Sequence, residues 1–314
     1  MAWPFGLFET LEMSTLLKWM GLGLLSAAGV TLASTAIASA RQNDPAKGKD
    51  GKPAPAPFPW DPNVGGPWLE GIDVNYVVDW PRAKASAGLS FAICKAVQGD
   101  PVTGGRGYGH YESSWVKNRA GLVVRAELPF WGAYLYPILS QDPKNQAQAL
   151  VRAIGPLTEA QDARMLPPAI DLEWEFNDGK SPKGAPFPAT NQNQTIDFLY
   201  VFAEVMRAEL GRKGMIYSSA GWWNSIGDPI DPIQQAFAWW IAQWSIGAAE
   251  GHPTLPKGVS KASIIQYSAK SGPRSLEKID GTPQAKSKEV AVDRDRFPGT
   301  LEDLRAFVMA SKIG

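Results

Sequence analysis

Two carboxylates stand two residues apart in the segment Leu166–Glu175, whose sequence is LPPAIDLEWE. The segment predicts a short buried strand, because its two prolines come first and proline is tolerated at the start of a strand but not in its middle. Side chains alternate between the faces of a strand, so Asp171 and Glu173 point to the same side, with Cα atoms roughly 6.5 Å apart. Acid/base cleavage of a glycosidic bond needs two such carboxyl groups, one of them kept protonated. For these two residues alone, a solvent-exposed acidic strand end is the alternative.

The composition narrows the classes of function. The 31 basic and 31 acidic residues give a formal net charge of zero, which argues against a nucleic-acid binder that neutralises phosphates. The single cysteine, Cys94, excludes an intrachain disulfide and lies in an apolar run that favours a buried, inert thiol. Only two histidines are present and no metal-ligand spacing occurs, so we predict no metal and no cofactor. The 13 tryptophans indicate either a groove that stacks sugars or a large core.

The start of the chain differs in composition from the remainder. No charged residue occurs from Trp19 to Ala40, and this run is long enough to span a bilayer. It ends in Ala-Ser-Ala, a pattern of small residues that signal peptidases cut. A cleaved signal peptide and a weak membrane anchor are the alternatives. We therefore divide the chain into an export segment at 1–40, a linker rich in proline and lysine at 41–68, and a folded domain at 69–314.

Strands and helices alternate along the folded domain, which predicts parallel β/α units of an α/β fold. Later strands follow one another with little helix between them, so the second half of the predicted barrel has lost helices. Acidic residues fall at strand ends, where the chemistry of a β/α barrel takes place. We predict strands at 69–75, 89–96, 130–136, 166–175, 214–218, 239–244 and 263–267, and helices at 80–88, 111–120, 145–154, 193–210 and 301–309.

Several motifs occur together in a fixed order from Gly71 to Phe297. They are GIDV at 71–74, FAICKA at 91–96, GAY at 132–134, AIDLE at 169–173, IYS at 216–218, WIAQW at 240–244, QYS at 266–268 and VDRDRF at 292–297. In this order and spacing the chain resembles glycoside hydrolase family 25, the Chalaropsis-type lysozymes. The resemblance implies an irregular TIM-like (β/α)5(β)3 barrel. It also implies cleavage of the β-1,4 bond between N-acetylmuramic acid and N-acetylglucosamine in peptidoglycan.

The acidic residues of that family match four acids here. By this resemblance Glu173 is the general acid/base, and Asp171 orients the 2-acetamido group of the substrate, which attacks the anomeric carbon. A direct carboxylate nucleophile is the alternative route to the same stereochemistry. Asp73 and Asp293 are expected to hold the pKa values of the pair apart and to bind sugar hydroxyls.

Aromatic and amide side chains along the same strands are candidates for sugar binding. For each aromatic taken singly, core packing is the more frequent role. The candidates are Tyr134, Trp174, Trp240, Trp244, Gln266 and Tyr267. The sequence departs from the family at the rim of the predicted groove, where Gln98 replaces a glutamate and Leu135 replaces a histidine.

The leading hypothesis is a peptidoglycan hydrolase, either a phage endolysin or another enzyme that lyses the cell wall. The alternatives on the same fold are a non-catalytic peptidoglycan-binding module and a virion-associated structural protein. Four intact acids favour the enzyme, and the hydrophobic N-terminus favours an exported protein over a virion component. We expect a monomer that is secreted, periplasmic or tethered to the membrane, with bacterial peptidoglycan as its partner.

Overall fold

The computed structural model describes residues 67–102, 109–173, 191–249, 251–269, 279–283 and 292–313. Within these ranges eight strands close into a barrel in the order β1-β9-β8-β7-β6-β5-β4-β2, and β2 returns to β1. The predicted export segment, most of the linker and Trp174 lie outside the described residues. The strands are β1 (Trp68–Val74), β2 (Phe91–Gln98), β4 (Phe130–Tyr136), β5 (Ala169–Asp171), β6 (Met215–Ser218), β7 (Ala238–Ala242), β8 (Ile264–Ser268) and β9 (Asp293–Pro298), with β3 (His110–Tyr111) against β2.

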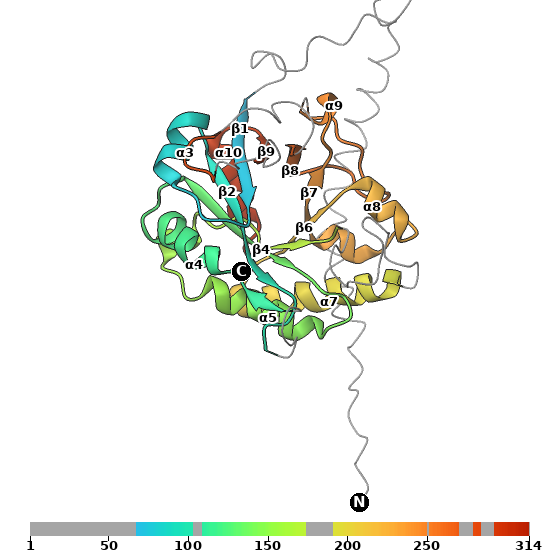
Figure 1. Cartoon of the computed structure of the whole chain (residues 1–314). Coiled ribbons are helices and arrows are strands. Elements are labelled where there is room, and N and C mark those ends of the chain that lie inside the picture. The colour runs from blue at the N-terminus through green and yellow to red at the C-terminus, as the bar shows by residue number, and fades with distance from the viewer. Residues whose placement is uncertain are drawn as a thin grey trace, which may run out of the picture. The chain divides into compact units, whose positions relative to one another are not determined.

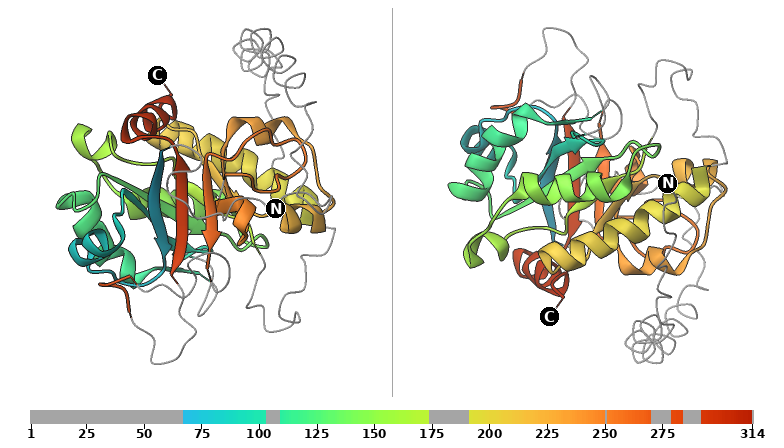
Figure 2. Two further views of the ribbon diagram at one scale, coloured as in Figure 1. Left: turned by 90° about the horizontal axis from the view of Figure 1, so that it is seen from above. Right: turned by 90° about the horizontal axis from the view of Figure 1, so that it is seen from below.

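The strands other than β9 run parallel around the barrel, and β9 is antiparallel to both β8 and β1. Strands β1, β9 and β8 lie side by side in the sheet (Figure 2, left). This arrangement confirms the predicted irregular α/β barrel.

Helices are longer in the first half of the barrel than in the second, as the sequence predicts. Helices α5 and α7 pack together against the barrel (Figure 2, right). Between β6 and β8 the described helices have only four to six residues. The helical segments are α3 (Trp80–Ala87), α4 (Ser113–Arg119), η1 (Ala120–Val124), α5 (Pro143–Ile154), α6 (Glu159–Asp162), α7 (Asn191–Leu210), α8 (Ala220–Ser225), η2 (Pro232–Ala236), α9 (Ile246–Ala249) and α10 (Leu301–Ala310).

Local capping sets the ends of α3. The side chain of Asp79 accepts a hydrogen bond from the backbone N–H of Arg82, and Pro81 occupies the first turn, where its missing N–H costs nothing. Gly88 ends the helix with φ of 65°, a left-handed conformation that glycine adopts without a steric penalty.

The core has two layers. One lies between strands and helices, and the other fills the barrel with side chains such as Phe91, Ile93, Met215 and Phe297. Packing inside the barrel is tight: a Cβ on Gly71 would lie 2.3 Å from the ring of Phe91. A side chain at position 71 would therefore displace that ring.

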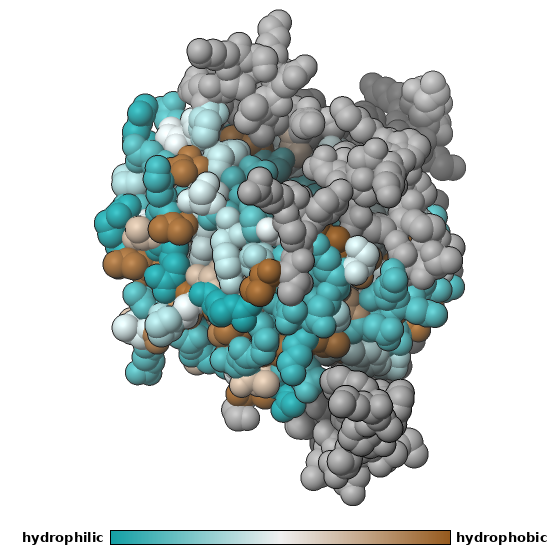
Figure 3. All heavy atoms as spheres, turned by 60° about the horizontal axis from the view of Figure 1, so that its bottom comes forward, coloured by the Kyte–Doolittle hydropathy of each residue, from teal (hydrophilic) through white to brown (hydrophobic). Residues whose placement is uncertain are grey.

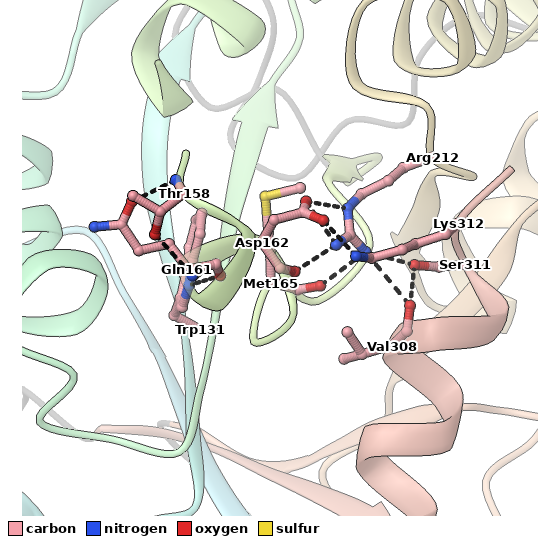
Figure 4. Close-up of polar contacts among 9 residues, drawn as sticks. All are labelled: Trp131, Thr158, Gln161, Asp162, Met165, Arg212, Val308, Ser311 and Lys312. Atoms are coloured by element: carbon pink, nitrogen blue, oxygen red, sulfur yellow. Dashed lines mark hydrogen bonds and ion pairs between the residues drawn. The ribbon is translucent and has the colours of Figure 1, made fainter. Parts of the chain in front are cut away.

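Arg212 ties the C-terminal helix to the end of the barrel where the parallel strands begin (Figure 4). Its guanidinium donates to the side chain of Asp162, the carbonyl of Met165 and the hydroxyl of Ser311, which follows α10. Asp162 also pairs with Lys312. Arg212 is 1% exposed, and each of its guanidinium nitrogens donates a hydrogen bond. We interpret this network as structural, because none of its residues is among the four acids predicted from the sequence.

On the face in Figure 3, hydrophobic residues are scattered among hydrophilic ones and form no continuous patch over the described part. In the portion of the chain that the structure describes, no helix combines the length and hydropathy that membrane crossing requires. The predicted export segment is not part of that portion.

Candidate active site

The residues that point into the barrel change character along each strand. On β6, Met215 lies at the strand start and Tyr217 nearer its end, and both belong to the inner core. On β8, Ile264 is followed two residues later by Gln266. Alternation brings every second side chain to the barrel interior, so an apolar layer at one end gives way to a polar layer at the carboxyl ends of the parallel strands.

The four predicted acids meet in this polar layer. Asp73 lies one residue before the end of β1, Asp171 ends β5, and Asp293 begins β9 directly opposite Asp73. Their mutual electrostatic effects show that these three carboxyls and Glu173 are close together. The structure therefore brings together all four acids that the sequence singles out, three of them on strands and Glu173 two residues after the end of β5.

The strand that carries the pair is shorter than predicted. Strand β5 ends at Asp171, so Glu173 follows the strand instead of extending it. Leu172 is 1% exposed and packs in the layer between strands and helices. The predicted alternation thus holds for Asp171 and Leu172, while the position of Glu173 depends on the backbone beyond the strand.

Glu173 has the electrostatics of a proton donor. Burial, together with the nearby charge of Asp293, raises the pKa of Glu173 to about 7, against the opposing effect of Lys95. Burial and the neighbouring Glu173 also raise the pKa of Asp171 well above its ordinary value. A carboxyl that stays protonated near neutral pH meets the requirement for a general acid.

Gln266 holds Asp73 in place. The Nε2 of Gln266 donates to Oδ2 of Asp73 at 2.8 Å. Its Oε1 accepts hydrogen bonds from Trp244 Nε1 at 2.7 Å and from the hydroxyl of Tyr217 at 3.1 Å. These donors fix the orientation of the amide, so the amide nitrogen faces the carboxyl. Gln266 is 2% exposed and acts as a support for Asp73.

The aromatic candidates differ in their surroundings. Trp240 is buried, its ring lies 4.5 Å from that of Tyr217 and 6.2 Å from that of Tyr134, and its indole donates to Asp295 at 2.8 Å. Trp244 lies beyond the end of β7 and is 44% exposed. Trp240 and Tyr134 are thus buried near the acids, whereas Trp244 is partly open to solvent.

Tyr267 does not lie with the four acids of the candidate site. It is 0% exposed, its hydroxyl donates to Glu70 at 2.8 Å, and the guanidinium of Arg296 lies 4.6 Å from the centre of its ring. Its neighbour Gln266 points inward, so Tyr267 points to the outer face of β8. A ring buried in that network has no face for a sugar, and this corrects the prediction for Tyr267.

Three residues that the sequence analysis did not assign take part in the site. Tyr217 and Asp295 contribute hydrogen bonds, and Lys95 is the cation that acts on both Asp171 and Glu173. Lys95 donates to Gln98 at 2.6 Å and lies 3.5 Å from Glu112. For Asp295 the sequence did offer a signal: it lies two residues after Asp293, and on a strand this spacing puts both acids on one face.

Among the described residues, no group of three or more histidine, cysteine or acidic side chains has a geometry that would hold a metal ion. What the arrangement provides is a carboxyl whose pKa is raised to about 7, Glu173, beside a second carboxyl, Asp171. Asp73 and Asp293 act on this pair, and the half-exposed Trp244 is linked to Asp73 through Gln266. This combination matches the requirements of glycosidic bond cleavage.

Comparison with known proteins agrees with this chemistry. The sequence profile described as Glycosyl hydrolases family 25 matches residues 72–274, which include Asp73, Asp171 and Glu173. Lysozyme M1 from Streptomyces globisporus is 27% identical over 241 residues, which are 76% of this chain and 70% of that protein.

Solved structures share the fold. The bacterial lysozyme from Streptomyces coelicolor superposes with a TM-score of 0.58 at 23% identity, covering 79% of this chain and 100% of that one. A muramidase from Acremonium alcalophilum gives 0.57 at 21% identity, covering 77% and 99%. The profile match extends over more than half of the sequence and contains the acidic pair at the end of β5, so the chain belongs to glycosyl hydrolase family 25 and is a glycoside hydrolase.

Proposed function

We propose that this enzyme is a lysozyme that hydrolyses the β-1,4 bond between N-acetylmuramic acid and N-acetylglucosamine in bacterial peptidoglycan. The observation that carries the proposal is the pairing of Asp171 with Glu173. Burial and the nearby charge of Asp293 raise the pKa of Glu173 to about 7. The relatives named lysozyme and muramidase support the same substrate class.

Glu173 acts as the general acid in this proposal. Its neutral carboxyl donates a proton to the glycosidic oxygen as the bond to the anomeric carbon breaks. The resulting carboxylate then takes a proton from the water that completes the reaction, which restores the acid. A pKa of about 7 suits both steps, because neither protonation state is costly to reach near neutral pH.

Asp171 acts at the anomeric carbon, the atom that the glycosidic oxygen leaves. It orients the 2-acetamido group of the substrate for attack on the anomeric carbon, or attacks that carbon itself, and both routes retain the anomeric configuration. Asp73 and Asp293 add negative charge beneath the sugar, where positive charge develops in the transition state. Gln266 keeps Asp73 turned toward the site through the 2.8 Å hydrogen bond.

Trp244 is the residue that we assign to sugar stacking. Its indole nitrogen is held by Gln266 at 2.7 Å while 44% of the residue is exposed. A ring that is fixed at one edge and open on a face loses little conformational freedom when a flat ligand binds. Tyr134 and Trp240 support the site from below, and Trp174 remains a further candidate outside the described residues.

We also propose that the enzyme works outside the cytoplasm, exported through residues 1–40. The uncharged run from Trp19 to Ala40 supports this proposal, because it has the length of an export signal or membrane anchor. Cell fractionation with N-terminal sequencing tests it. Cleavage near Ala40 or recovery with the membrane is expected, and intact soluble protein in the cytoplasm would contradict export and favour packaging into a virion.

The bond that is cleaved can be identified from the products. Peptidoglycan is digested with the full-length protein, the new reducing ends are reduced with borohydride, and the fragments are analysed by mass spectrometry. The proposal predicts reduced N-acetylmuramic acid at the new ends. Reduced N-acetylglucosamine would show that the enzyme cuts the other glycosidic bond, and fragments with intact glycan strands would contradict glycan cleavage.

A further inference from the structure

Asp295 lies one inward position deeper than Asp293 on β9. Its register partners are Gly71 of β1 and Gln266 of β8, and its side chain is 0% exposed. The indole of Trp240 donates to its Oδ1 at 2.8 Å. Gln266, the register partner of Asp295 on β8, is also the residue whose amide binds Asp73, so the Asp295 carboxyl is a neighbour of Asp73 on the inner face of the barrel.

No described donor satisfies the second oxygen of Asp295. Its Oδ2 is buried, and within the described ranges no N–H or O–H group reaches it. The group beside it, the Asp73 carboxyl, already accepts a hydrogen bond from Gln266. Two carboxylates in contact are both acceptors, so neither satisfies the other unless a proton lies between them.

Within the described ranges, the charged groups that act on the two carboxyls are acids. Those that act on Asp295 are Asp73, Asp293 and Glu70, and those that act on Asp73 include Asp171. The neighbouring arginines of β9 act on Tyr267, on the outer face of the barrel. Burial, followed by the charges of Asp295, Asp293 and Asp171, raises the pKa of Asp73 well above its ordinary value, against the effect of the hydrogen bond from Gln266.

Burial also raises the pKa of Asp295, although the hydrogen bond from Trp240 opposes the shift. Two buried carboxyls in contact titrate as one unit, and the first proton is lost much more easily than the second. We propose that Asp73 and Asp295 hold one proton between them, and that Asp295 is the residue that positions Asp73 in the active site. This role rests on the proposed function of the same site.

The shared proton has two consequences. It ties the Asp73 carboxyl to Asp295 on one side while Gln266 holds it on the other, which fixes the rotation of Asp73. It also limits the pair to a single negative charge. A second charge at this depth would raise the pKa of Glu173 further and make Glu173 a weaker proton donor to the glycosidic oxygen.

Infrared spectroscopy of the full-length protein labelled with ¹³C-aspartate tests the shared proton directly. The C=O stretch of a protonated aspartyl group is expected at neutral pH in the wild-type protein. Because burial raises the pKa of Asp171 as well, the decisive spectra are recorded in the Asp171→Asn background. The band is expected to vanish there when either Asp295→Asn or Asp73→Asn is added, because an amide supplies the missing donor without a titrating proton. The band is expected to persist in Asp171→Asn and in Asp197→Asn, a matched change at an exposed position of α7.

Activity separates positioning from simple packing. Asp295→Asn keeps an acceptor for Trp240 and a donor for Asp73, so it is expected to retain at least about a third of kcat/KM. Asp295→Ala loses both contacts and is expected to lose more than about tenfold, mainly in kcat. Circular dichroism verifies the fold of each variant.

Absence of the band in Asp171→Asn, or its persistence when Asp295→Asn is added to that variant, would overturn the shared proton. Equal activity of Asp295→Asn and Asp295→Ala would overturn the positioning role. A band that behaves as expected in a protein without peptidoglycan hydrolysis would support the pair and contradict the proposed function, so the two failures are distinguishable.

Discussion

Asp73 of β1 and Asp293 of β9 are direct register partners on antiparallel strands. Residues in this relationship have Cβ atoms about 4.5–5.5 Å apart, and like charges there destabilise a sheet. Asp293 is also among the groups that raise the pKa of Asp73, Asp171 and Glu173. The pairing therefore concentrates negative charge at the end of the barrel where the substrate is proposed to bind. Repulsive clustering of this kind is typical of functional sites and unusual elsewhere.

Removing these charges one at a time is expected to separate their roles. Asp171→Asn should lower kcat/KM most, because Asp171 acts on the reacting group. Asp73→Asn and Asp293→Asn should lower it less, with small effects on the fold. Asp293→Asn should also move the alkaline limb of the pH–rate profile to lower pH, because Asp293 raises the pKa of Glu173. Wild-type activity and an unchanged profile in Asp293→Asn would show that this residue is structural.

Lys95 is expected to tune Glu173 in the opposite direction. Its charge lowers the pKa of both Asp171 and Glu173. Lys95→Met should therefore raise the pKa of Glu173 above about 7 and shift the alkaline limb of kcat/KM to higher pH. Lys117→Met, at an exposed position of α4, is the matched control and should leave the profile unchanged. A shift to lower pH in Lys95→Met would contradict the proposed electrostatics.

The raised pKa of Glu173 has a cost in stability that depends on pH. Its ordinary pKa is 4.5 and its folded-state pKa is about 7, so the folded protein holds this proton more tightly than the unfolded chain. Below the ordinary value the group has no effect, and the free energy of unfolding falls as pH rises from about 4.5 to about 7. One pKa unit corresponds to about 1.4 kcal/mol, so the loss approaches about 3 kcal/mol.

Glu173→Gln removes this titration. Its melting temperature should therefore exceed that of the wild-type protein at about pH 8, and the difference should shrink at about pH 4.5. Calorimetry at both pH values measures the effect. A wild-type protein that is as stable as the variant at the higher pH would show that the carboxyl is not strained by burial.

The regular part of the fold was predictable because its signals are local. The apolar run at 130–136 became β4 with the same bounds, and the proline and glycine at the ends of α3 marked that helix to within one residue. Strand β9 was missed as a strand because its sequence, DRDRFP, carries charges on both faces. Its acids point into the barrel and its arginines outward, an alternation that no apolar run reveals.

The residues that support the acids were less predictable, because their roles depend on contacts across the barrel. Gln266 reaches Asp73 over 193 positions of sequence, and Trp240 reaches Asp295 over 55. Tyr267 illustrates the reverse: an aromatic next to Gln266 in sequence lies on the other face of the strand. A difference of one residue along a strand decides whether a side chain points into the barrel, toward the proposed substrate site, or to the outer face.

The measurement that bears most directly on the central claim is the rate at which Glu173→Gln releases reducing ends from peptidoglycan, compared with the wild-type protein at the same pH. The amide has nearly the same shape but delivers no proton, so a loss of roughly a hundred- to ten-thousand-fold is expected in a variant that remains folded. A variant that keeps more than about a tenth of the wild-type rate would show that Glu173 is not the general acid, since general acid catalysis is worth far more than that.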